Sequence, residues 1–239
     1  PTSTFCTRLL SMEYTKENFE NGAVLLIDKP MEWTSFDVIR KLRNLIRIKK
    51  IGHAGTLDPL ATGLLVVCTG KFTKRINEYM AKEKEYTGVI TFGAVTPTYD
   101  LESEPENFQS IDALSIEFIQ EKIKDFTGLI YQRPPAHSAI KLNGKRVYEL
   151  ARAGKEVKLE PRPVHIYEFE IVKYQTGQLH FRVVCSTGTY IRSLAHDIGQ
   201  SLGCGAYLSS LRRTRIGEYL IQDALTMERF HQLFVAATN

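Results

Sequence analysis

The chain has 239 residues, of which 43% are hydrophobic and 24% charged, and its formal net charge is +4. These proportions are those of a globular protein and exclude a disordered, collagen-like or disulfide-stapled chain. Area scaling predicts a folded surface of about 11,000 Å² against about 39,000 Å² for the unfolded chain, so one large core or two smaller ones are possible. The small positive charge is a weak indication of an anionic partner, and its distribution along the chain is more informative.

The cysteines and the apolar segments bear on the cellular compartment. None of the four cysteines has the close spacing of a zinc knuckle or a C-x-x-C motif, so we expect reduced thiols. The longest apolar runs, such as 23–27 and 64–68, are far below the ~20 residues of a membrane-spanning helix. The first ten residues also lack the apolar core of a signal peptide. We therefore expect a cytoplasmic protein without a membrane segment.

The N-terminal part predicts an extension, a strand and a basic helix. Residues 1–20 are polar and aperiodic and predict an N-terminal extension that is loosely packed or docks late. The apolar run 23–27 predicts a buried strand, which is stopped at Pro30. Thr34 or Ser35 then caps a helix whose apolar residues recur at spacings of three and four. The other face of this helix and the residues after it carry six cations and no anion: Arg40, Lys41, Arg43, Arg47, Lys49 and Lys50.

Loops and short elements alternate through the middle of the chain. Residues 52–63 predict a loop rich in Gly, Thr and Pro, and residues 64–69 predict a second buried strand. A short helix over 73–80 and a strand over 86–92 follow. Residues 97–113 are acidic and predict a loop.

The second half of the chain predicts a hairpin and further helices. Ser115 caps an amphipathic helix that ends at Gly128. Strands over 165–174 and 178–185 are joined through Thr176-Gly177, which is a hairpin signal. The remaining predicted elements are helices over 147–153, 189–202 and 226–235 and a strand over 212–219. Because helices and strands mix without a regular βαβ rhythm, we expect an α+β fold with a mixed, largely antiparallel sheet flanked by helices.

The loop over 52–63 is the first candidate for a chemical site. Three glycines, a proline and two threonines specify a tightly shaped loop between the basic helix and a buried strand. Asp58 precedes Pro59, and a following proline favours an extended backbone. On spacing alone, a simple turn in which Asp58 bonds its own backbone is an alternative. A phosphate-binding P-loop is disfavoured because no lysine follows the glycines.

Six segments of the chain together resemble one enzyme family. The loop over 52–63 is similar to the catalytic motif of the TruB family of pseudouridine synthases, which isomerise uridine in tRNA. Five other segments resemble further motifs of that family in the same order: 28–30 with 34–35, 84–86, 132–135 with 138–141, 188–194 and 208–213. The resemblance implies the pseudouridine synthase fold. It also implies that a catalytic domain over 21–239 ends in a short helical tail and lacks a complete PUA domain.

The resemblance implies catalytic roles for three side chains. Asp58 would be the catalytic aspartate, Arg192 would pair with it and keep it ionised, and Tyr86 would stack on the target uracil. The carboxylate would attack the sugar, attack the ring or remove a proton from the sugar, and the sequence leaves this choice open. Taken singly, Arg192 is more typical of an ordinary ion pair and Tyr86 of a half-buried strand residue.

Further residues are expected to contact RNA. His53 would fill the space that the extruded base leaves, Lys29 would lie near the site, and Leu211 would contribute to an apolar wall. A track of cations would bind RNA phosphates, although a charged helix face is more often only solvated. The expected track consists of Arg40, Arg43, Arg47, Lys49, Lys50, Lys141, Arg212 and Arg213.

The resemblance also implies the substrate and the partners. The expected substrate is the T stem-loop of tRNA, in which uridine 55 would be isomerised. No metal ion, redox cofactor or obligate protein partner is expected, and we expect a monomer. Three alternatives remain: a relative that acts on rRNA with guide RNAs, a catalytically silent RNA-binding module, and an N-glycosidase that releases the base.

Overall fold

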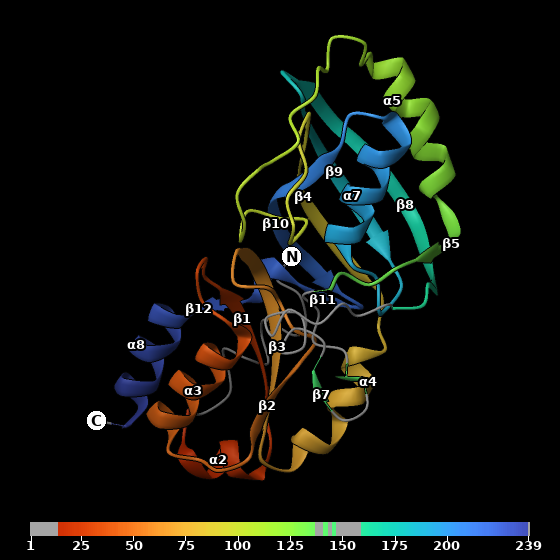
Figure 1. Cartoon of the computed structure of the whole chain (residues 1–239). Helices are drawn as coiled ribbons and strands as arrows, with labels where there is room; N and C mark the ends of the chain where they lie inside the picture. The colour runs from red at the N-terminus through yellow and green to blue at the C-terminus, as the bar shows by residue number, and fades with distance from the viewer. Residues whose placement is uncertain (1–13, 137–140, 143–144, 147–158, 239) are drawn as a thin grey trace. The chain divides into compact units, whose positions relative to one another are not determined.

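The computed structural model describes residues 14–136, 141–142, 145–146 and 159–238 (Figure 1). The chain forms two compact units: a first unit of Pro1–Tyr86 with Leu211–Asn239, and a second unit of Thr87–Ser210. The second unit is therefore one continuous segment that interrupts the first. Two strands, β4 (Lys84–Phe92) and β10 (Ala206–Ile216), include residues of both units.

The first unit contains a mixed set of strands. Besides its parts of β4 and β10, they are β1 (Val24–Lys29), β2 (Ile51–Ala54), β3 (Ala61–Thr69), β11 (Tyr219–Leu220) and β12 (Leu225–Thr226). The order is β12-β1-β3-β10, with β2 paired to β3 and β11 paired to β10. β1 is antiparallel to β3, whereas β10 is parallel to it and places Leu211 opposite Ala61. The continuous apolar sequences of β1 and β3 are explained by their burial.

Helices complete the core of the first unit. They are α2 (Lys16–Asn21), α3 (Ser35–Ile46), η1 (Gly70–Arg75), α4 (Ile76–Met80), η3 (Ile221–Asp223) and α8 (Met227–Thr238). Helix α8 lies beside α3 (Figure 1). Phe19 of α2 is fully buried, with its ring centroid 6.0 Å from that of Phe230 in α8. The described end of the expected extension thus packs into the core, and residues 1–13 lie outside the described chain.

Helix α3 begins with the cap that the sequence predicts. The Thr34 hydroxyl accepts a hydrogen bond from the Asp37 N–H at 3.0 Å, and the Asp37 carboxylate accepts one from the Thr34 N–H at 2.9 Å. This reciprocal capping box satisfies donors that every helix start leaves free. Val38 and Leu42 are fully buried, which confirms the predicted apolar face. On the other face, Arg40 and Lys41 are exposed, whereas Arg43 is half-buried.

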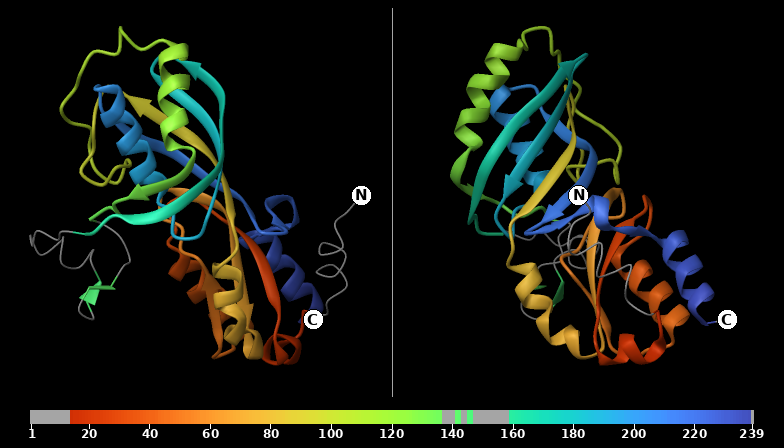
Figure 2. Two further views of the ribbon diagram at one scale, coloured as in Figure 1. Left: turned by 90° about the vertical axis from the view of Figure 1, so that its right-hand side faces the viewer. Right: turned by 180° about the vertical axis from the view of Figure 1, so that it is seen from behind.

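The second unit combines a hairpin-based sheet with two helices. Its remaining elements are α5 (Ile116–Ile123), η2 (Lys124–Phe126), β5 (Gly128–Gln132), β6 (Lys141–Leu142), β7 (Lys145–Arg146), β8 (Arg162–Gln175), β9 (Gln178–Cys185) and α7 (Ile191–Leu202). Its sheet has the order β4-β9-β8-β5, and β6 pairs separately with β7. Thr176 and Gly177 have positive φ values of 53° and 75°, as the predicted hairpin turn requires. Helices α5 and α7 lie on the same side of the long hairpin (Figure 2).

The α+β fold with a mixed sheet is confirmed, but the loop over 52–63 is shorter than expected. β2 continues to Ala54 and β3 begins at Ala61, so the loop is confined to 55–60. Gly63 lies inside β3 with φ 105°, and a Cβ atom there would lie 2.3 Å from the Arg213 carbonyl oxygen. This glycine therefore permits two strands to approach closely, a requirement that its sequence neighbours do not reveal.

Other element boundaries also differ from the expectation. The strand expected over 212–219 is two strands, because Gly217 with φ 52° turns the chain between β10 and β11. The helix expected over 73–80 begins earlier, as the 3-10 helix η1. The helix expected over 147–153 lies outside the described residues. Within the described ranges, no helix is long and apolar enough to cross a membrane.

Candidate active site

Asp58 lies on the six-residue loop between β2 and β3 in the first unit. The residue before it is fixed by α3, because the Ser35 hydroxyl accepts a hydrogen bond from the Leu57 N–H at 2.9 Å. The same hydroxyl donates to the Leu57 carbonyl at 3.2 Å. The Asp58 carbonyl itself accepts from the Ala61 N–H at 3.0 Å. The first turn of α3 thus holds the loop that carries the predicted catalytic carboxylate.

The residue after Asp58 is fixed by the end of β1. The Pro59 carbonyl accepts a hydrogen bond from the Glu32 N–H at 2.9 Å and another from the Lys29 ammonium group at 3.3 Å. This ammonium group also donates to the carbonyl oxygens of Pro30 and Trp33. Both neighbours of Asp58 are therefore tied to other elements, which restricts the position of its side chain.

Lys29 is a buried cation beside this carboxylate. Its side chain is fully buried, and this burial lowers the pKa of Lys29 to about 8. The Asp58 carboxylate opposes the shift and raises the pKa, whereas the Arg213 guanidinium lowers it further. Lys29 is thus positively charged at neutral pH. Its electrostatic interaction with Asp58 supports the prediction that the two side chains lie near each other.

Arg213 is a buried cation that binds the backbone of β3 and of the Asp58 loop, and it does not line an RNA surface. It is 1% exposed, and its guanidinium donates to the carbonyl oxygens of Leu64 at 2.8 Å and Gly55 at 3.0 Å. The expectation that Arg213 contacts RNA phosphate is wrong, because the side chain is buried and its Nε and Nη2 atoms already donate to backbone carbonyls. The neighbouring Arg212 is 41% exposed and forms a bidentate ion pair with Asp28 at 3.0 and 2.8 Å.

Three further predicted residues belong to the first unit. His53 lies on β2, and burial lowers its pKa, helped by the nearby Arg213 charge and opposed by a hydrogen bond to Gly55. Its imidazole is therefore neutral at pH 7. Tyr86 on β4 is 8% exposed, and Leu211 on β10 is half-buried.

Arg192 lies in the first turn of α7, in the second unit. Its side chain is 4% exposed, and its Nη1 atom donates to the Thr98 carbonyl at 3.1 Å. Its Nε atom lies 3.7 Å from a carboxylate oxygen of Asp100, which is itself buried. Asp58 belongs to the other unit, so its pairing with Arg192 stays a prediction. Sequence reasoning missed Asp100, since it is one of many acids in a segment predicted as loop.

An aromatic stack adjoins this ion pair. The rings of Tyr99 and His196 lie 3.9 Å apart with an interplanar angle of 14°. Tyr99 has a positive φ of 66°, which is unusual for a bulky residue, and it separates the two residues that bind Arg192. His196 is one helical turn beyond Arg192 and is kept neutral because burial lowers its pKa. The stack therefore fixes the segment that holds the guanidinium.

Comparison with known proteins assigns the chain to a family. The profile of the TruB family pseudouridylate synthase N-terminal domain matches residues 43–191, and that of the tRNA pseudouridylate synthase B C-terminal domain matches residues 192–239. The chain belongs to the TruB family. It is therefore an isomerase of the pseudouridine synthase class.

The relatives of this TruB-family chain include proteins of similar length. It is 49% identical to tRNA pseudouridine synthase B of Flavobacterium johnsoniae over 91% of this chain and 98% of that protein. The corresponding protein of Phocaeicola vulgatus is 47% identical over 89% of this chain and 93% of that protein. A crystal structure of a Cbf5-Nop10-Gar1 complex contains a chain that is 30% identical, with a TM-score of 0.68 over 89% of this chain. The present chain spans about half of that protein, namely 54%.

The basic face of the TruB-family chain is only partly available to a ligand. Arg47, Lys49 and Lys50 are exposed. Arg40 is exposed but paired with Asp37 at 2.8 Å, while Arg43 is half-buried. Nothing is described of the Lys141 side chain. Within the described ranges, no group of three or more His, Cys, Asp or Glu side chains is arranged to hold a metal ion.

Proposed function

We propose that this chain converts uridine 55 in the T stem-loop of tRNA into pseudouridine. The observation that carries the proposal is the fixed backbone of Asp58 beside the buried cation Lys29. A carboxylate held in this way can start a rearrangement without the cost of ordering it first. The relatives named tRNA pseudouridine synthase B support tRNA as the substrate.

The proposed reaction moves a glycosidic bond within one nucleotide. The bond from the ribose to N1 of uracil breaks, the base turns, and a bond from the ribose to C5 forms. The proton on C5 is lost and N1 gains one, so nothing is added overall. Asp58 acts as nucleophile or base, and both roles require it to be ionised. Arg192 would favour that ionised form by its opposite charge.

The other predicted residues would hold the extruded nucleotide. Tyr86 would stack on the uracil, Leu211 would form an apolar wall, and His53 would fill the gap in the RNA loop. His53 suits this task because it is neutral at pH 7 and brings no charge among unstacked bases. Exposed cations after α3 would bind phosphates and position the RNA.

Replacement of Asp58 tests the proposal directly. The Asp58→Ala variant should lose tritium release from a tRNA transcript labelled at uracil C5, while it keeps its fold and much of its RNA affinity. Activity above about 1% of wild type, a barrier increase of less than roughly 2.7 kcal/mol, would contradict an essential role. Asp112→Ala is the matched control, since Asp112 is an exposed loop aspartate and should be dispensable.

The same assay separates the alternatives. A synthase releases tritium while the base stays attached, a glycosidase releases free uracil, and a binding module does neither. The chain should act on a tRNA transcript without any guide RNA or added protein. A requirement for a guide RNA would favour the rRNA-directed alternative. Mapping of the modified site on total tRNA should identify position 55 alone.

A further inference from the structure

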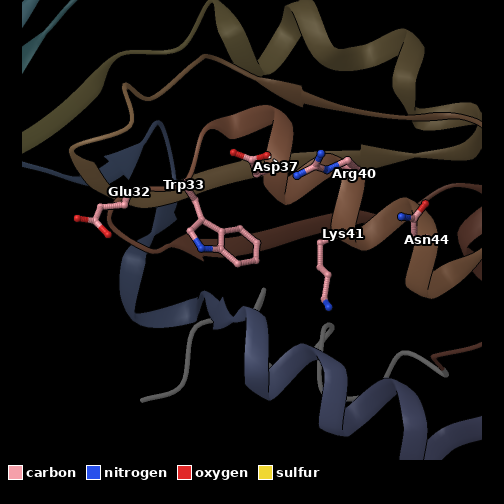
Figure 3. A pocket seen from close by; sticks show the side chains of 6 residues that line it. All are labelled: Glu32, Trp33, Asp37, Arg40, Lys41 and Asn44. Atoms are coloured by element: carbon pink, nitrogen blue, oxygen red, sulfur yellow. Dashed lines mark hydrogen bonds and ion pairs between the residues drawn. The ribbon is translucent and has the colours of Figure 1, made fainter. Parts of the chain in front are cut away.

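A pocket on the outer side of α3 is not used by the proposed chemistry. It has a volume of about 370 Å³ and is lined by Glu32, Trp33, Asp37, Arg40, Lys41 and Asn44. Figure 3 shows the Trp33 indole and the Lys41 side chain extending into the same space, with Asn44 further along the helix. A pocket of this size can accommodate a group as large as one nucleoside, but it is too small for a folded protein partner.

The indole of Trp33 forms a fixed aromatic wall of this pocket. Trp33 is the single tryptophan of the chain, is half-buried, and packs in part against the core of the first unit. Its carbonyl oxygen accepts a hydrogen bond from the Lys29 ammonium group, which also binds the Pro59 carbonyl. The pocket and the Asp58 loop are therefore held by the same cation.

Some polar side chains of the pocket already form hydrogen bonds or ion pairs with described residues, and others do not. The Asp37 carboxylate accepts hydrogen bonds from Thr34 and pairs with Arg40 at 2.8 Å, so both of these charges are occupied. Lys41 and Asn44, by contrast, make no side-chain hydrogen bond or ion pair with any other described residue. The pocket thus presents an aromatic face, a cation and an amide that can both donate and accept, and its lining also includes the exposed carboxylate of Glu32.

We infer that this pocket binds one nucleotide of the RNA substrate, distinct from the uridine that is isomerised. Its base stacks on Trp33, its edge is hydrogen-bonded by Asn44, and its phosphate pairs with Lys41. Unpaired RNA bases are commonly held by aromatic stacking together with polar contacts to their edges. The inference rests on the proposed function, because it requires an RNA substrate with an unstacked base outside the catalytic position.

Intrinsic fluorescence provides a local test. Because Trp33 is the single indole, its emission reports on this pocket alone. Titration with a T stem-loop transcript should quench the emission, and the RNA concentration at half-saturation should equal the dissociation constant found by filter binding. Emission that is unchanged at saturating RNA would overturn the inference. The Asp58→Ala variant can be used in the same titration, so that turnover does not affect the signal.

Substitutions provide a second, independent test. Trp33→Ala should raise KM and the dissociation constant about 10-fold at nearly unchanged kcat, and Trp33→Phe should restore most of the loss. Lys41→Ala and Asn44→Ala leave the core intact and should each weaken binding several-fold, whereas the exposed Lys124→Ala control should not. Wild-type affinity in both Lys41→Ala and Asn44→Ala would overturn the inference. Inactivity of the wild-type chain on tRNA would instead refute the proposed function.

Discussion

At the scale of single residues, the Lys29 ammonium group joins the turn after β1 to the Asp58 loop. It binds carbonyl oxygens on both sides of the turn after β1 and one on the Asp58 loop. Burial lowers its pKa from 10.5 to about 8. A lysine with a lowered pKa loses its proton at a lower pH in the folded state than in the unfolded state. Its positive charge is thus present below about pH 8 and is lost above it.

This titration predicts a pH dependence of the reaction. If the Lys29 charge supports the ionised Asp58, the wild-type kcat should fall as the pH rises through about 8. Lys29→Met should have low activity that does not follow this titration between pH 7 and 9. Initial rates of tritium release over this range provide the measurement. An identical decline in both proteins would assign the pH dependence to another group.

Asp100 shows the limit of sequence reasoning for single residues. The motifs predict Asp58, Tyr86 and Arg192 as site residues, but the buried contact between Asp100 and Arg192 joins residues far apart in the chain. Arg213 illustrates the opposite error, since a run of arginines suggested a surface role and the fold buries this one. Neither the partner of a charge nor its burial can be deduced from neighbouring residues alone.

At the scale of elements, the N-terminus of α3 combines two tasks. Thr34 caps the helix, and Ser35 holds Leu57 in the adjacent loop. The cap was predictable because it depends on residues three apart. The ends of β2 and β3 could not be predicted in this way, because the need for a glycine at position 63 arises from the close approach of the Arg213 backbone.

Substitution of these two residues should separate the tasks. Thr34→Ala should lower the free energy of unfolding by about 1 kcal/mol and leave kcat nearly unchanged, because only the cap is lost. Ser35→Ala leaves the buried Leu57 N–H without its partner and should cost about 1–3 kcal/mol. It should also lower kcat, because the Asp58 loop loses its tether. Urea unfolding and single-turnover rates test both effects, and an unchanged kcat in Ser35→Ala would contradict the coupling.

At the scale of the whole chain, charge is distributed unevenly. The segment over 40–50 holds six cations and no anion, whereas 99–125 holds eight acids and two lysines. These segments belong to the first and the second unit respectively. The net charge of +4 therefore hides a basic region in the unit that carries Asp58.

This distribution predicts how salt affects RNA binding. Combined replacement of Arg47, Lys49 and Lys50 by alanine should weaken binding and reduce the slope of log K against log salt by about 2–3, since each lost phosphate contact removes about 0.7–0.9. Replacement of Lys122, Lys124 and Lys173 in the second unit removes the same charge and serves as the control. Equal slopes for the two triple variants would argue against a phosphate track after α3.

The interrupted first unit has a consequence for synthesis on the ribosome. Its sheet needs β10 and β12, and its aromatic core needs Phe230, all of which are made last. The second unit is complete once Ser210 has emerged. β1 can pair with β3 early, but its other neighbour, β12, and the Phe230 partner of Phe19 are made only afterwards. The part of the nascent chain that is made first therefore acquires some of its native partners last, and the edge of β1 that pairs with β12 stays uncovered through most of translation.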